Sequence, residues 1–138
     1  MECNLGYNVS VVIGANFGDE GKGYVSNALC ANSIGETLTI LPTGGSQRAH
    51  TVDCNNKLCT GRHVYHHFAS GTMNKSHTYY GCDFIMNPME FMRESRELGS
   101  LCPGWNLHCN LYANPRCFVT TPFDMLFNQI KEESRGEG

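Results

Sequence analysis

The sequence predicts an α/β fold, mainly a parallel sheet with flanking helices and a β-hairpin. Three observations predict it. A valine-rich run at residues 8–13 ends in glycine, as buried parallel strands do before a phosphate-binding loop. Residues 22–32 have helix-forming character, and residues 37–41 are β-branched and apolar in alternation. Strand, glycine-rich loop, helix and strand together make one βαβ unit.

The elements after this unit follow from turn and strand signals. Residues 42–50 are predicted to form a loop beyond the carboxyl end of the second strand, where ligand sites of open α/β sheets gather. Residues 51–53 and 62–68 are predicted as strands, and the turn-forming residues 54–57 join them as a hairpin. Residues 107–112 are predicted as a further strand.

Two later helices have recognisable starts. Asn87 is a capping residue followed by proline, which predicts a helix running to about Leu98 and ending at Gly99. Thr121 precedes another proline and begins a final helix. Apolar residues on or beside these helices are predicted to face inward; they are Met86, Met89, Met92, Met125, Leu126 and Ile130.

Composition limits the function classes. A chain of 138 residues fits one domain, and a net charge of −3 with ten Lys and Arg lacks the basic footprint of a nucleic-acid binder. No apolar run approaches the roughly 18 residues of a membrane span, and no leader pattern is present, so a cytoplasmic location without membrane contact is predicted. The eight cysteines are therefore expected to stay reduced.

Residues 18–23, Gly-Asp-Glu-Gly-Lys-Gly, form the most informative stretch. The glycines let backbone N–H groups approach an anion, the following helix N-terminus favours negative charge, and Lys22 adds a full positive charge. Asp19 beside a phosphate is repelled unless a cation lies between them or the carboxylate has a proton to abstract, so Asp19 indicates chemistry. Glu20 is interpreted as a helix-start residue.

The stretch departs from a standard P-loop. Gly14 lies two residues too far from Gly21 and Lys22, and Gly23 replaces the hydroxyl residue that would bind Mg²⁺. A metal ion here must take other ligands, with Asp19 and backbone carbonyls of a neighbouring loop as candidates.

Two loops together carry a resemblance. Residues 11–23, followed by Gly-Gly-Ser-Gln-Arg-Ala-His-Thr at 44–51, resemble the N-terminal part of adenylosuccinate synthetases, whose signature is GDEGKG. Residues 66–72 and 119–125 look like a divergent branch of that family, so the resemblance covers nearly all of the chain. It implies the N-terminal part of that family's P-loop-like fold, with residues 1–138 as one segment of a nucleotide-binding domain and no second domain.

The family is considerably longer, and its guanine-recognition and aspartate-binding segments and much of its inosinate-binding segments lie beyond residue 138. The chain is therefore expected to be a truncated front section that is inactive alone. The possible partners are a complementing C-terminal chain or, as the family's dimeric habit implies, a second copy.

The resemblance implies GTP-dependent joining of inosine monophosphate (IMP) and L-aspartate to give adenylosuccinate, with Mg²⁺ as cofactor. It assigns Asp19 as general base and His50 as general acid, and it places Mg²⁺ on Asp19 and the Ala49 carbonyl. The GTP-binding residues implied are Gly18, Asp19, Glu20, Gly21, Lys22, Gly23, Ala49, His50 and Thr51. The IMP-binding residues implied are Asp19, Glu20, Gly21, Lys22, Gln47, Arg48, Ala49 and His50.

Departures from the family pattern keep alternatives open. Where the family has Asn-Ala-Gly before His-Thr, this chain has Gln47, Arg48 and Ala49, and Arg48 either reaches a phosphate or faces solvent. Some phage relatives act on deoxyguanylate and several replace the loop Asp, so Asp19 favours inosinate. The second hypothesis is a non-catalytic fragment that binds Mg²⁺-nucleotide. The third is a zinc-stabilised protein, based on Cys54, Cys59, His63, His66 and His67.

Overall fold

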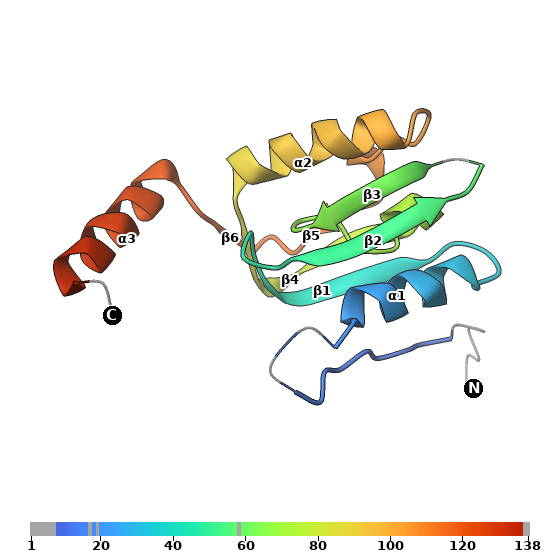
Figure 1. Cartoon of the computed structure of the whole chain (residues 1–138), viewed down its shortest axis with the longest axis horizontal. Helices are drawn as coiled ribbons and strands as arrows, with labels where there is room; N and C mark the ends of the chain where they lie inside the picture. Colours follow the sequence, from blue (N-terminus) through green and yellow to red (C-terminus); the bar gives the residue numbers. More distant parts are fainter. Residues whose placement is uncertain (1–7, 17, 19, 58, 137–138) are drawn as a thin grey trace.

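The computed structural model describes residues 8–136 except 17, 19 and 58. A sheet lies at the centre, with a separate hairpin and two helices packed around it and a third helix extending away (Figure 1). In chain order the elements are α1 (Lys22–Ala31), β1 (Leu38–Gly44), β2 (His50–Asn55), β3 (Thr60–Tyr65), the short 3₁₀ helix η1 (Thr72–Asn74), β4 (His77–Met86), α2 (Pro88–Leu101), η2 (His108–Asn110), β5 (Leu111–Ala113), β6 (Phe118–Val119) and α3 (Pro122–Arg135).

β4 is the centre of the sheet. It pairs in parallel with β1, β5 and β6, while β2 and β3 form a separate antiparallel hairpin. The prediction of a mainly parallel sheet with a hairpin is thus confirmed. β4 itself was not predicted, because Gly81 interrupts its apolar alternation. At that point the β1–β4 register shifts, and a Cβ on Gly81 would lie 2.7 Å from the Pro42 carbonyl oxygen, so glycine permits the close approach.

The main hydrophobic core lies between the hairpin and α2. Its buried members come from the hairpin, from α2, from the segment that joins the hairpin to β4 and from the segment after α2; they are Val52, Cys59, Tyr65, Phe68, Met73, Phe91, Leu98, Cys102 and Leu107. A smaller cluster on β1 and β4 contains Leu41, Tyr80 and Phe84, with the last two rings stacked 4.1 Å apart. The main cluster holds the hairpin against α2, and Met86 and Leu111 of the sheet pack against both clusters.

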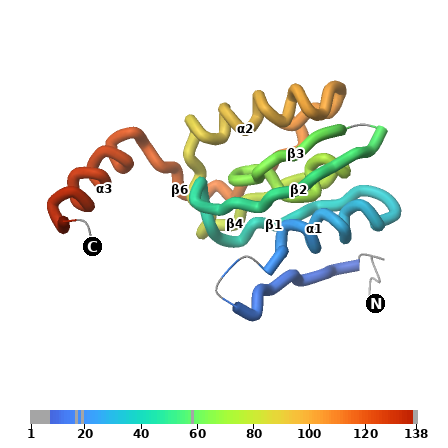
Figure 2. The backbone as a smooth tube through the Cα atoms, viewed as in Figure 1, coloured from blue at the N-terminus to red at the C-terminus, as the bar shows by residue number. Residues whose placement is uncertain are grey.

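The predicted first strand is wrong. Residues 8–14 form no strand, and Val9, Val11 and Ile13 are 86%, 80% and 82% exposed. An apolar run becomes a strand only where a sheet edge accepts its hydrogen bonds, and here residues 10–13 lie beside α1 instead (Figure 2). The predicted helix at 22–32 is confirmed as α1.

Several predicted boundaries move. β1 continues through Pro42 to Gly44, which the sequence placed in a loop. The Asn87 cap is confirmed, since its side-chain oxygen accepts the N–H groups of Met89 and Glu90 at 3.1 and 3.3 Å. α2 passes Gly99 and ends at Leu101, and the strand predicted at 107–112 is reduced to β5 behind a 3₁₀ turn.

The inward-facing helix residues are mostly a wrong prediction. α3 begins as predicted, with a capping box between Thr121 and Asp124, but it projects away from the sheet (Figure 1) and none of its residues is buried. The predicted core residues of α2 and α3 are at least 43% exposed; they are Met89, Met92, Met125, Leu126 and Ile130. Met86 alone packs against the core. Within the described ranges, no helix is long and apolar enough to cross a membrane.

The expectation that all cysteines stay reduced is also wrong. Cys59 at the end of the hairpin turn and Cys102 at the end of α2 form a disulfide, with Cα atoms 4.5 Å apart. The hairpin turn and the end of α2 lie side by side there, and the 43 residues between the two cysteines give no sign of this in the sequence. Because Cys59 is bonded to Cys102 and the buried His63 and His67 face Glu94, the histidine-cysteine string does not gather as one ligand set. Among the described residues, no group of three or more possible ligands gathers to hold a metal ion.

Candidate functional site

The glycine-rich loop is organised around the carboxylate of Glu20. One oxygen of this side chain accepts the N–H groups of Asn16 and Gly18 at 2.9 and 3.4 Å, and the other pairs with Lys22 Nζ. The Lys22 ammonium and the backbone N–H groups lower the pKa of Glu20 to about 2. The Gly18 N–H and the Lys22 ammonium, which the sequence assigns to phosphate, therefore contact the carboxylate of Glu20 in the same loop.

Asp19, predicted as general base and metal ligand, lies outside the described residues. The roles assigned to it stay predictions.

His50 begins β2 and lies against the first turn of α1. Gly23 makes this possible, because a Cβ on Gly23 would lie 2.5 Å from His50 Cβ and 3.1 Å from Ser70 Oγ. Burial lowers the pKa of His50, and the positive charges of Arg48 and Lys22 lower it further. The two glycine-rich loops, far apart in the sequence, thus meet at one histidine whose pKa lies below its ordinary value.

We expect Gly23→Ala to lower the free energy of unfolding by about 1–3 kcal/mol, because the added methyl group has no room beside His50. Alanine has a higher helix propensity than glycine, so a loss of stability in this variant would come from the steric clash and not from helix propensity. The matched control is Gly99→Ala in α2, where a Cβ meets nothing within 4 Å and a gain of about 0.5–1 kcal/mol is expected. Urea unfolding of both variants checks the pair; equal effects at the two sites would contradict the close Gly23–His50 contact.

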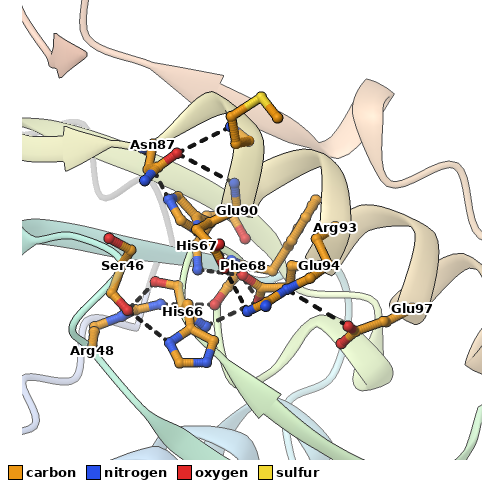
Figure 3. Close-up of polar contacts among 12 residues, drawn as sticks. Ser46, Arg48, His66, His67, Phe68, Asn87, Glu90, Arg93, Glu94 and Glu97 are labelled. Carbon is orange, nitrogen blue, oxygen red and sulfur yellow. Dashed lines mark hydrogen bonds and ion pairs between the residues drawn. The ribbon is translucent and has the colours of Figure 1, made fainter. Parts of the chain in front are cut away.

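The loop before His50 departs from the sequence expectation at Arg48. Its guanidinium is partly buried and turned to the backbone: Nε donates to the His66 carbonyl at 3.1 Å and Nη2 to the Phe68 carbonyl at 2.8 Å (Figure 3). Gln47, Ala49 and Thr51 are exposed around it. Ala49 has no positive φ, so the expected glycine-to-alanine departure causes no backbone strain.

One buried carboxylate was not expected from the sequence. Glu94 is buried in α2, and its carboxylate accepts the N–H groups of His66, His67 and Phe68 at 3.1, 2.6 and 3.1 Å. Burial opposes its ionisation, but His63, His67 and the backbone donors outweigh burial and hold the pKa of Glu94 below its usual value. The sequence offered one signal for it: Phe91, Glu94 and Leu98 share the apolar face of a predicted helix.

The donor set expected for Mg²⁺ fits the ion chemically. The Ala49 carbonyl and the Asp19 carboxylate are oxygen donors, which Mg²⁺ prefers. Glu20, the other carboxylate of the loop, is taken by Lys22 and two N–H groups. Any ion would therefore rely on Asp19 rather than Glu20 unless the loop rearranges.

Comparison with known proteins gives one consistent result. Residues 11–138 match the family model described as adenylosuccinate synthetase. The chain is 30% identical over 128 residues to the adenylosuccinate synthetase of Synechocystis sp., covering 92% of this chain and 27% of that protein. It is 30% identical over 129 residues to that of Thermomicrobium roseum, covering 93% of this chain and 28% of that protein.

A solved structure of fully ligated adenylosuccinate synthetase from Plasmodium falciparum has the same fold, with a TM-score of 0.71 at 23% identity over 88% of this chain and 26% of that one. The predicted fold is thereby confirmed. The chain spans about a quarter of the length of the relatives it matches.

Proposed function

Because the chain belongs to the adenylosuccinate synthetase family, a family of ligases, we propose that residues 1–138 form the phosphate-binding and acid–base part of its active site, as one segment of the nucleotide-binding domain. The observation that carries this proposal is the contact of Gly23 with His50, which joins the two loops that bear the family's motifs. The reaction proposed is the joining of IMP and L-aspartate at the expense of GTP, in purine biosynthesis in the cytoplasm.

The first chemical step is activation of a poor leaving group. Asp19 removes the ring N–H proton of IMP, and the resulting 6-oxygen attacks the γ-phosphorus of GTP, so that GDP leaves. His50, whose pKa is lowered by burial, donates an N–H hydrogen bond to the oxygen on which charge develops. The aspartate amine then displaces phosphate from the 6-position.

The remaining residues position these groups. Gly18, Glu20, Gly21, Lys22, Gly23, Ala49 and Thr51 are assigned to nucleotide phosphates, and Gln47 to IMP together with the loop residues. Mg²⁺ held by Asp19 and the Ala49 carbonyl would neutralise phosphate charge. Phosphate binding requires Lys22 to exchange its pairing with Glu20 for the ligand.

The chain alone is expected to give no turnover, because the family's aspartate- and guanine-binding segments are not among its residues. A sharper test is a chimera in which residues 11–138 replace the matching 128-residue region of the Synechocystis relative. Its rate of adenylosuccinate formation should fall at least 100-fold with either Asp19→Asn or His50→Gln. Near-unchanged rates in these variants would refute the assignments, and Mg²⁺-GTP binding by an inactive chimera would favour the non-catalytic alternative.

We also propose a complementing polypeptide as the partner of this chain, with a second copy as the alternative. Exposed apolar residues on one helix support association; they are Phe123, Met125, Leu126, Phe127 and Ile130 of α3. Light scattering of the chain alone and mixed with the C-terminal part of a relative distinguishes the two.

A further inference from the structure

The loop that carries His50 is fastened to the protein interior through Arg48. Two nitrogens of its planar fork donate to carbonyls two residues apart, those of His66 and Phe68. The guanidinium carbon also lies 6.0 Å from the centre of the Phe84 ring. A flexible ammonium could not reproduce this two-point contact, because it lacks the rigid fork.

The segment that Arg48 contacts is itself held from the opposite side. Glu94 accepts the N–H groups of His66, His67 and Phe68, so α2 fixes the backbone whose carbonyls Arg48 uses (Figure 3). A third hydrogen bond, between His66 Nδ1 and the Ser46 carbonyl oxygen at 2.9 Å, also links the loop to this segment. The His50 loop, the 66–68 segment and α2 are therefore one hydrogen-bonded unit.

This arrangement is costly for a guanidinium. The side chain is partly buried, and the cation contacts carbonyls rather than a carboxylate. A charge desolvated in this way is retained where its hydrogen bonds hold a structure in place.

We propose that Arg48 is a positioning residue that fixes the loop at residues 45–49, and with it the Ala49 carbonyl and the His50 ring, instead of contacting the phosphate of IMP. Only the roles of Ala49 and His50 rest on the proposed function; the anchoring stands without it. This assignment replaces the IMP contact that the sequence implied for Arg48.

The first test uses the unmodified chain without ligand. By NMR, the Nε–H proton of Arg48 should exchange with water at least tenfold more slowly than that of the exposed Arg116, because it donates to the His66 carbonyl. Equal exchange at the two arginines would overturn the anchoring. Since no nucleotide is added, this result is independent of whether the proposed function holds.

The second test separates anchoring from ligand contact. Arg48→Lys keeps the charge but loses the fork. In the unmodified chain the backbone N–H of residue 48 donates to the Gly45 carbonyl at 3.0 Å; in the variant this N–H should exchange with water at least tenfold faster. The backbone N–H of Leu98 in α2 should keep its rate. Arg48→Met, which also loses the fork, should show the same faster exchange at residue 48. Native exchange at residue 48 together with weaker IMP binding would identify Arg48 as a ligand contact and overturn the proposal. If neither variant folds, the exchange of Nε–H in the unmodified chain decides.

Discussion

Replacing Glu94 with leucine is expected to lower the free energy of unfolding by about 3–5 kcal/mol. Leucine fills a similar volume but accepts no hydrogen bond, so the N–H groups of His66, His67 and Phe68 would lose their acceptor in the interior. His63 and His67, 3.6 and 3.4 Å from the Glu94 oxygens, would lose their charged neighbour as well. Urea unfolding at pH 7 measures the effect.

Glu97 provides the control on the same helix. Its side chain is 55% exposed, and its contacts with His63 and Arg93 are long, at 3.8 and 3.9 Å. Glu97→Leu should therefore change stability by less than about 1 kcal/mol. Similar losses in the Glu94 and Glu97 variants would contradict the central place given to Glu94.

The pH dependence of stability tests the same carboxylate. The folded pKa of Glu94 lies below its ordinary value of 4.5, so its contribution to stability is complete above the unfolded pKa and disappears as the pH falls through the folded one. The unmodified chain should lose stability more steeply than Glu94→Gln between about pH 5 and pH 3. Parallel stability curves for the two proteins over that range would contradict the lowered pKa.

Local signals predicted most of the fold. Caps at Asn87 and Thr121 and the hairpin turn depend on neighbours in sequence, and all three appear in the structure. Elements that depend on distant partners were less predictable. β4 is central because three strands pair with it, and residues 8–13 are apolar but find no ladder among the described residues.

The site divides in the same way. The family resemblance assigned both glycine-rich loops to one site, and the structure brings Gly23 and His50 of these loops together. The contact of Arg48 with the 66–68 segment was not, since its partners are backbone carbonyls that any residue types would supply. Glu94 was equally hidden, because its partners are backbone N–H groups 26 to 28 residues away.

The Cys59–Cys102 disulfide gives the second large effect. Its sequence separation is 43 residues, and closing a loop of that size in the unfolded chain corresponds to a stabilisation of about 4 kcal/mol. We expect reduction of the unmodified chain to lower the free energy of unfolding by about 3–4 kcal/mol, measured by urea unfolding with and without a reducing agent. Comparing two redox states of one sequence avoids any change in core packing.

The double variant Cys59→Ala/Cys102→Ala supplies the control, since its stability should not respond to the reducing agent. The disulfide joins the hairpin to the end of α2, and Glu94 joins the segment just after the hairpin to the middle of the same helix. Because both fasten one pair of elements, Glu94→Leu should cost more in the reduced chain than in the oxidised one, and the two losses should not add. If Glu94→Leu lowers the free energy of unfolding equally in both redox states, the two attachments act on independent parts of the fold. A larger loss in the reduced chain would show that the disulfide and Glu94 together hold α2 to the hairpin and to the segment that follows it.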